Sequence, residues 1–179
     1  GIKVDYVKVA DDIAVKDSLY TVGRRGVAGT VFVHKIAGAA ASKGYELARV
    51  KELAQKAADN VTSLGFAYTS CTVPAKGTPT FTLADDEMEY GVGIHGEPGI
   101  RREKILPSKE LAQRIVDDLF LDRPNLTEVA VLVNGFGTTP LQELYVFNND
   151  VCEHLASKGI KIYRTFVGNY MTSIDMAGA

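Results

Sequence analysis

The sequence predicts an α/β fold, and three observations lead to this prediction. Segments 30–43 and 50–64 have the composition and apolar spacing of helices. Residues 128–133 form a short continuous apolar run, which is typical of a strand buried in a parallel sheet. An amphipathic pattern at 141–155 and an apolar run at 160–167 follow, so this part of the chain predicts a strand–helix–strand unit.

The composition indicates one ordinary globular domain, with at most a piece of another. The chain has 179 residues, of which 46% are hydrophobic and 23% charged. A chain of this size buries about two-thirds of the surface that its unfolded form exposes, so a core forms without disulfides or metals. Disordered, collagen-like and disulfide-scaffold proteins are excluded by this composition.

Charge and hydropathy argue against nucleic acid or membrane as a partner. The formal net charge of −2 offers no basic face, and the short pairs Arg24-Arg25 and Arg101-Arg102 are expected to be solvated loop charges. The longest apolar stretch, 26–41, is shorter than the ~20 residues that span a bilayer. Cys71 and Cys152 lack the spacing of metal ligands, which predicts a reducing compartment and a cytoplasmic protein.

The N-terminal residues predict a strand followed by a linker. Residues 2–9 alternate apolar with charged side chains, the pattern of a half-buried strand. Segment 17–29 carries glycines and no sustained periodicity, so we expect a linker with a domain boundary near 20–28. Because the chain begins Gly-Ile-Lys, it is expected to be a piece of a longer protein.

Two helices are expected next. The first, 30–43, is apolar nearly all round and precedes Gly44, so we expect a largely buried helix that ends there. The second places apolar residues at helical spacing from Val50 to Leu64, with Gly65 as its stop.

The central part of the chain predicts strands and a third helix. Segments 66–73, 81–83 and 87–94 have strand composition, and the first ends at a proline. Apolar residues then recur every four positions, which predicts a helix with Ser108 as its N-cap. In the last helix, Thr139 and Gln142 are expected to form a capping box around Pro140.

His95 is the candidate for chemistry among the three histidines. His34 and His154 lie in helical patterns and are expected to be structural. His95 lies in Gly91-Val-Gly-Ile-His-Gly-Glu-Pro-Gly99, at the expected end of a strand, where glycines let a ligand approach the ring. A neutral imidazole acts as a base, a ligand or a nucleophile, although a plain turn histidine remains an equal alternative. No metal site is expected, since only Glu97 accompanies this histidine.

Two other groups of residues could have a function, but a structural role is favoured for each. Residues 134–140 could bind an anion through backbone N–H groups, but a simple helix start is favoured because the P-loop spacing is missing. Asp85, Asp86, Glu87 and Glu89 are expected to form a solvated acidic turn rather than an acid/base pair.

Several long motifs are spread over the whole chain. They are Arg25-Gly-Val-Ala-Gly-Thr30, His34-Lys-Ile-Ala-Gly-Ala39, Ser70-Cys-Thr-Val-Pro74, the segment 81–100 around His95, Val133-Asn-Gly-Phe-Gly-Thr-Thr-Pro-Leu-Gln-Glu-Leu-Tyr145 and Thr172-Ser-Ile-Asp-Met-Ala-Gly178. In this order they resemble the substrate-binding (K) subunit of dihydroxyacetone kinases.

The resemblance implies a role for His95 and its neighbours. In that family this histidine adds a ring nitrogen to the carbonyl carbon of the ketone, giving a hemiaminal. Gly93, Gly96 and Glu97 are then expected to belong to the same substrate site. Glycerol has no carbonyl, so the covalent bond would select the ketone.

The resemblance also implies a domain organisation. Residues 1–20 would be the last strand of a first domain with the start of a linker, and 21–179 a second domain truncated at its C-terminus. That second domain is expected to be two-layered, with a mixed sheet covered by helices on one face. The glycine, second histidine and aspartate that hold and deprotonate the substrate hydroxyl would lie in the missing part, so the fragment alone is expected to be inactive.

The family further implies the partners. No cofactor is expected on this chain, because the nucleotide and magnesium belong to a separate L subunit or domain, and a homodimer is expected. The phosphoryl donor, ATP or a phosphotransferase relay, stays open. Two alternatives also stay open: a ligand-sensing co-activator that keeps the histidine without the catalytic aspartate, and a structural dimerisation domain.

Overall fold

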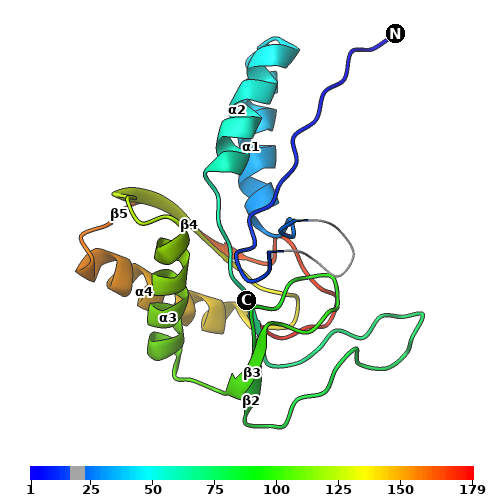
Figure 1. Cartoon of the computed structure of the whole chain (residues 1–179), viewed down its shortest axis with the longest axis vertical. Coiled ribbons are helices and arrows are strands. Elements are labelled where there is room, and N and C mark those ends of the chain that lie inside the picture. Colours follow the sequence, from blue (N-terminus) through cyan, green and yellow to red (C-terminus); the bar gives the residue numbers. More distant parts are fainter. Residues whose placement is uncertain (17–22) are drawn as a thin grey trace. The chain divides into compact units, whose positions relative to one another are not determined.

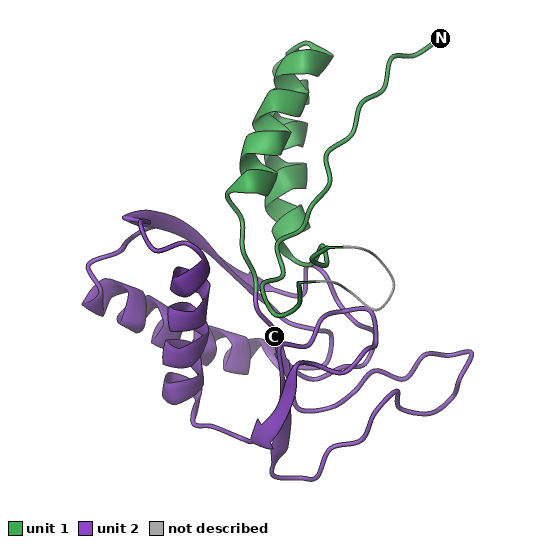
Figure 2. Cartoon of the chain, in the orientation of Figure 1, with its two compact units in different colours: residues 1–63 green, residues 64–179 purple. Residues whose placement is uncertain are grey.

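The computed structural model describes residues 1–16 and 23–179, which divide into two compact units (Figure 2). Unit 1 comprises Gly1–Ser63 and unit 2 comprises Leu64–Ala179. The predicted domain boundary at 20–28 stays a prediction. Part of that range lies outside the described residues, and the division into compact units does not test it.

Unit 1 contains two helices packed on each other, α1 (Gly29–Ser42) and α2 (Leu47–Asp59) (Figure 1). The predicted first helix is confirmed, and Gly44, with φ +76°, follows its end as expected. Its predicted burial is wrong, because residues 34–36 are exposed. Among the described residues of this unit α2 is the one helix that packs on α1, and one neighbour covers one side only.

The end of α2 lies well before Gly65, which was the predicted stop. The Asn60 side-chain amide donates to the Lys56 carbonyl at 2.8 Å. Beyond it the chain is extended: the Ser63 N–H donates to the Asp11 carbonyl at 2.7 Å, and the Ile13 N–H donates to the Ser63 carbonyl at 3.0 Å. This pairing satisfies backbone groups that a longer helix would have used, so the helix ends early.

The predicted strand at 2–9 is absent from the described residues of the chain. Ile2, Val4 and Tyr6 are more than four-fifths exposed, and no ladder of hydrogen bonds joins this segment to another. An alternating pattern supplies one face of a strand but no partner for its backbone, and a strand needs both.

The segment just before α1 is held firmly, although a loose linker was expected for 17–29. Residues 17–22 lie outside the described part, whereas Val27 and Ala28 are buried. The Asp11 carboxylate accepts the N–H groups of Val27 at 2.7 Å and Gly29 at 2.9 Å. A carboxylate at a helix N-terminus satisfies free N–H groups and interacts favourably with the helix dipole.

Arg25 forms a buried ion pair and is not the solvated charge that the sequence suggested. Its Nε and Nη2 atoms lie 2.6 and 2.5 Å from Oδ2 of Asp12, and both side chains are only 2% exposed. Asp12 also accepts the Ala14 N–H. Burial raises the pKa of Asp12, while the guanidinium acts in the opposite direction. A charge withdrawn from water requires such a partner, which explains the pairing.

Unit 2 contains two small sheets and two helices (Figure 1). Strands β1 (Phe66–Ala67), β2 (Glu87–Tyr90) and β3 (Arg101–Lys104) form an antiparallel sheet in the order β1-β2-β3. Strands β4 (Glu128–Asn134) and β5 (Lys161–Gly168) pair in parallel through α4 (Leu141–Ser157), and α3 (Ser108–Asp122) packs on α4. The predicted strand–helix–strand unit is confirmed.

The C-terminal residues 176–179 connect the two sheets. On one side, Phe66 and Ala179 exchange two backbone hydrogen bonds of 2.9 and 3.1 Å in antiparallel fashion. On the other, Gly137 forms a parallel bridge with Met176, and the Phe136 N–H donates to the Gly178 carbonyl at 3.2 Å. Pairings of both directions therefore meet at this segment, and the predicted α/β class is confirmed.

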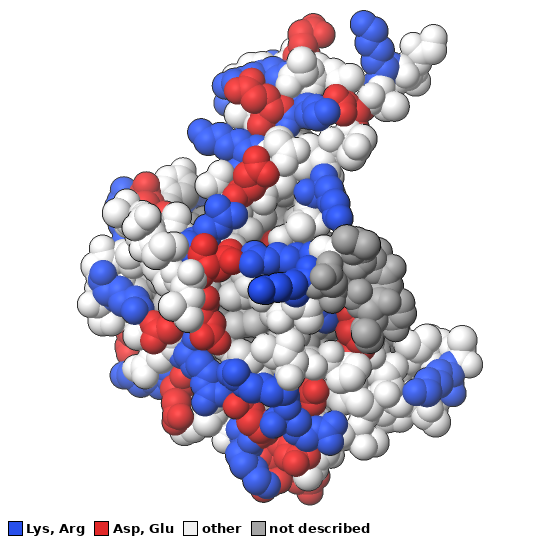
Figure 3. Space-filling model, in the orientation of Figure 1, with Lys and Arg blue, Asp and Glu red and all other residues white. Residues whose placement is uncertain are grey.

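The strands of the first sheet differ from the prediction. Strand β1 ends at Ala67, well before the predicted end at 73, and within that predicted strand Thr72 pairs with Pro79 in an isolated bridge. Residues 81–83 form no strand. The predicted loop at Arg101-Arg102 is instead strand β3, which pairs with β2, and Arg102 lies 3.4 Å from the buried Glu89. Figure 3 shows cationic and acidic side chains interleaved over this hairpin, as is common on a sheet edge.

Both predicted N-caps are wrong, because the hydroxyls bind elsewhere. Ser108 is the first residue of α3, and its Oγ donates to Oδ2 of Asp150 at 2.5 Å, joining α3 to α4. The Thr139 hydroxyl donates to the Gly178 carbonyl and accepts the Gly178 N–H, at 2.8 and 2.7 Å. Each side chain thus serves a long-range contact in preference to a local one.

Tyr90 ties the first sheet to α3. Its ring is buried, its hydroxyl donates to Oδ2 of Asp118 at 2.6 Å, and the Arg101 guanidinium lies 4.2 Å from its centroid. Burial and the hydrogen bond to the carboxylate raise the pKa of Tyr90 above its usual value. The phenol is therefore held neutral in the folded chain at alkaline pH.

Replacing Arg25 by methionine should destabilise unit 1 by about 3–5 kcal/mol, because the Asp12 carboxylate stays buried without its partner. Urea unfolding measures this loss. The control is Arg49→Met, which breaks an exposed pair with Glu52 and should cost less than about 1 kcal/mol. Equal losses in the two variants would contradict the role of the buried pair.

Replacing Tyr90 by phenylalanine should cost about 1.5–3 kcal/mol at neutral pH, the contribution of a hydrogen bond to a charged group. Since the folded pKa is raised, the wild-type stability due to this group is complete below pH 10 and declines as the pH rises further. The difference between the two proteins should therefore shrink above pH 10. Tyr163→Phe, on an exposed side chain, should show no such pH dependence.

Candidate functional site

His95 lies in a loop, residues 91–100, that connects β2 to β3. The two ends of the loop are joined, because the Ile100 N–H donates to the Tyr90 carbonyl at 2.8 Å. A Cβ on Gly99 would lie 2.3 Å from that carbonyl oxygen, so only glycine fits at this closure. His95 therefore belongs to a closed loop and does not lie at the strand end, since β2 stops at Tyr90.

The His95 side chain is exposed, while residues on both sides of it are anchored. Its ring makes no hydrogen bond or ion pair with any residue that the structure describes. Gly96 adopts φ +86°, and a Cβ there would lie 3.4 Å from Sγ of the buried Cys71. The loop thus presents an imidazole with both ring nitrogens available to a ligand.

The other predicted site residues lie inward. Gly93 and Glu97 are buried, and Gly96 is half-buried. Val92 belongs to a core cluster beneath the loop, with Ala67, Cys71, Phe136 and Met176, and Ile94 packs against it. The structure thus brings Gly93, Gly96 and Glu97 together with His95 in one loop, and their part in substrate binding stays a prediction.

Asn134, at the end of β4, organises the neighbouring segment 170–171. Its Oδ1 accepts the N–H groups of Tyr170 at 3.0 Å and Met171 at 2.8 Å, and its Nδ2 donates to the Met171 carbonyl at 2.7 Å. The backbone N–H groups of Gly135, Phe136 and Thr138 donate to carbonyls within the fold. These three donors are therefore already used within the fold, which favours the simple helix start, and anion binding by 134–140 stays a prediction.

The backbones of Ile174 and Gly137 lie very close together, and Ile174 is strained. Ile174 has φ +58°, an unfavourable conformation for a β-branched residue. Gly137 has φ +137°, and a Cβ there would lie 2.2 Å from the Ile174 carbonyl oxygen. Such strain persists only where the surroundings fix the backbone, and it is often found near functional sites.

Asp175 fastens the same segment to the loop 69–80. Its Oδ1 accepts the Thr72 N–H at 2.6 Å, and the hydrogen bonds from Thr72 lower the pKa of this carboxyl. The loop 69–80 and the His95 loop, 91–100, both contact the segment 170–175, the first through Asp175 and the second through a hydrogen bond from Ser173 to the Ile94 carbonyl. Sequence patterns gave no direct sign of Asn134 or Asp175 in this role, although both lie in motifs of the family resemblance.

The remaining candidates lie away from this loop. His34 is exposed on α1, and His154 of α4 binds Asp117 of α3 at 2.9 Å. Hydrogen bonds from Lys158 and then from His154 lower the pKa of Asp117. Of the acidic turn, Glu89 is buried and not solvated, and it pairs with Arg102 of β3. Among the described residues no group of three metal-ligating side chains occurs, and no helix has the length and apolar character needed to cross a membrane.

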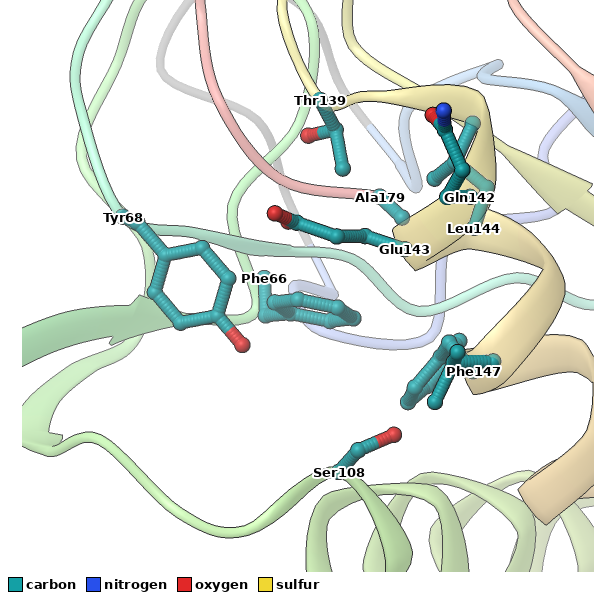
Figure 4. A pocket seen from close by; sticks show the side chains of 10 residues that line it. Phe66, Tyr68, Ser108, Thr139, Gln142, Glu143, Leu144, Phe147 and Ala179 are labelled. Atoms are coloured by element: carbon teal, nitrogen blue, oxygen red, sulfur yellow. The ribbon is translucent and has the colours of Figure 1, made fainter.

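Unit 2 also has a hollow of about 260 Å³, partly open to solvent, at the start of α4 (Figure 4). Aromatic rings of Phe66, Tyr68 and Phe147 line it, together with the polar groups of Ser108 and Glu143. Burial, and next the nearby Glu143, raise the pKa of Tyr68. No predicted site residue lines this hollow.

The close approach at Gly137 predicts a large loss of stability for Gly137→Ala. Steric displacement adds to the ~1–3 kcal/mol of backbone strain, so we expect a loss above about 3 kcal/mol in urea unfolding. The matched control is Gly159→Ala, where φ is +73° but nothing lies within 4 Å of the added Cβ. A loss at Gly137 no larger than that at Gly159 would show that the contact with Ile174 is not rigid.

Comparison with known proteins matches residues 1–179 to the Dak1 domain. The chain is 54% identical, over 99% of its length, to the dihydroxyacetone-binding subunit of PTS-dependent dihydroxyacetone kinase 1 from Listeria innocua, and covers 54% of that protein.

Solved structures agree with this match. A dihydroxyacetone kinase operon co-activator superposes with a TM-score of 0.90 at 38% identity, covering 99% of this chain and 56% of that one. The dihydroxyacetone kinase from C. freundii in complex with AMP-PNP and Mg2+ gives 0.79 at 34% identity, covering 95% and 31%. The chain thus spans about half the length, or less, of these relatives. It belongs to the Dak1 domain family.

Proposed function

We propose that this chain is the part of a dihydroxyacetone kinase subunit that captures the ketone on His95. The observation that carries the proposal is the exposed imidazole, free of hydrogen bonds to described residues, on a loop in which Gly93 and Glu97 are buried. The 54% identity to a dihydroxyacetone-binding subunit supports the choice of substrate.

The proposed chemistry is a nucleophilic addition. The lone pair of one ring nitrogen of neutral His95 forms a bond to the carbonyl carbon, and the π electrons of the carbonyl move to its oxygen. That oxygen takes up a proton, and the other ring nitrogen loses one, so the hemiaminal contains all atoms of both reactants. Glycerol offers no electrophilic carbon, which gives a selectivity that hydrogen bonds to hydroxyl groups would achieve less well.

The proposal assigns phosphoryl transfer to other parts of the enzyme. A nucleotide and magnesium on an L subunit or domain would supply the phosphoryl group, and this chain would hold the ketone in position for it. The C. freundii relative with AMP-PNP and Mg2+ supports a nucleotide elsewhere in the assembly. The fragment alone is then inactive, and a cytoplasmic homodimer remains part of the proposal.

A ligand-sensing co-activator is the second candidate, and the fit to the co-activator structure favours it. The higher identity to the kinase subunit, 54% against 38%, favours the kinase. Phosphorylation of dihydroxyacetone by the full-length protein with its L partner separates them, since a co-activator would bind the ketone without turnover.

The test uses the full-length protein and dihydroxyacetone labelled with carbon-13 at its carbonyl. In the wild type, part of the NMR signal should move from the carbonyl to the tetrahedral region. His95→Asn should abolish this signal, because the amide is not a comparable nucleophile. His34→Asn, on another exposed histidine, should leave it unchanged.

An unshifted signal in the folded wild-type protein would remove the basis for covalent capture. A shifted signal in His95→Asn as strong as in the wild type would assign the capture to a different residue.

A further inference from the structure

The Ser173 hydroxyl connects the segment 170–175 to the His95 loop. Its Oγ donates to the Ile94 carbonyl at 3.1 Å, and its N–H donates to the Phe136 carbonyl at 2.8 Å. Ser173 is only 4% exposed. The residue thus joins three separate stretches of chain immediately beside His95.

We propose that Ser173 is a positioning residue for His95, an inference that rests on the proposed function. The Ile94 carbonyl belongs to the peptide group whose nitrogen is that of His95. Because this group is planar, fixing the carbonyl oxygen fixes the plane from which the His95 Cα and its side chain project. The hydroxyl therefore restrains the backbone from which the imidazole projects, and narrows the range of directions that the ring samples.

The support behind Ser173 is rigid, which the role requires. Asn134 holds Tyr170 and Met171 with three hydrogen bonds, and Asp175 holds the Thr72 N–H. Between them Ile174 keeps its strained φ of +58°. A support fixed at both ends transmits little motion to the hydroxyl, and a nucleophile gains most when its geometry is preorganised.

The His95 side chain itself does not restrain this part of the loop. The imidazole makes no hydrogen bond to described residues, and Gly93 and Gly96 on either side lack side chains that would restrict the backbone. Removing the hydroxyl would leave the Ile94 carbonyl without this donor and allow the peptide group to rotate. The population of His95 rings in the reactive direction would fall accordingly.

The experiment compares Ser173→Ala with Ser70→Ala in the full-length protein. Ser70 is a matched control: it is buried too, but within the described part of the chain its hydroxyl donates to the carbonyl of its own neighbour Cys71, at 3.5 Å, and to no distant segment. Titration of labelled dihydroxyacetone, followed by the tetrahedral carbon signal, gives the apparent Kd. We expect Ser173→Ala to weaken capture about tenfold, as loss of one hydrogen bond implies, and Ser70→Ala to leave it within twofold.

A second, more conservative variant keeps the proposal testable if Ser173→Ala does not fold. Ser173→Cys keeps the shape but offers a weaker donor, so its apparent Kd should lie between those of wild type and Ser173→Ala. Affinities of folded Ser173 variants within twofold of wild type would overturn the positioning role while leaving His95 capture intact. A wild type without any tetrahedral signal would overturn the proposed function, and the inference with it. A purely structural role would lower the unfolding free energy of Ser173→Ala without changing the Kd of the folded protein.

Discussion

The pairing of residues 176–179 between β1 and the segment 136–138 is the interaction on which unit 2 depends. It joins the antiparallel sheet to the parallel strand pair, and both of its edges are used. The geometry leaves no space for side chains at Gly178, where a Cβ would lie 2.1 Å from the Phe66 carbonyl oxygen. Thr139 adds two hydrogen bonds to the same glycine. The start of α4 is thereby fixed to both sheets.

The pairing of residues 176–179 also helps to order the His95 loop, because this segment contributes to the core beneath the loop. The core cluster beneath it combines side chains from β1, the loop, the segment 136–138 and the C-terminal segment, including Phe136 and Met176. The Ser173 hydroxyl donates to the Ile94 carbonyl and the Asp175 carboxylate accepts the Thr72 N–H, so two loops are joined to the segment that contains the strained Ile174. An exposed histidine on a glycine-rich loop would otherwise lose much conformational entropy on binding, and the prior ordering of its backbone lowers this loss.

The sequence predicts the features that depend on residues close together in the chain, such as the helices. It does not predict contacts between residues that are far apart in the chain. The helices were foreseen because apolar spacing along one segment determines an amphipathic face. The strand at 2–9 was wrong because alternation says nothing about a pairing neighbour. Arg25 was misjudged because its carboxylate lies 13 positions away, and the caps at Ser108 and Thr139 because their hydroxyls bind 42 and 39 positions away. His95 was found through its glycines, whereas Ser173 is an ordinary polar residue until its contact is seen.

The contact of Ser173 with Ile94 spans 79 positions, and this separation governs when the His95 loop is completed during synthesis. A ribosome makes the chain from the N-terminus at about 5–20 residues per second, so the loop emerges several seconds before its support. Until residues 170–179 follow, the core cluster beneath the loop lacks Met176 and remains open to solvent. The nascent chain therefore exposes apolar surface at this place for a defined interval, and chaperone binding there would be transient and tied to translation speed.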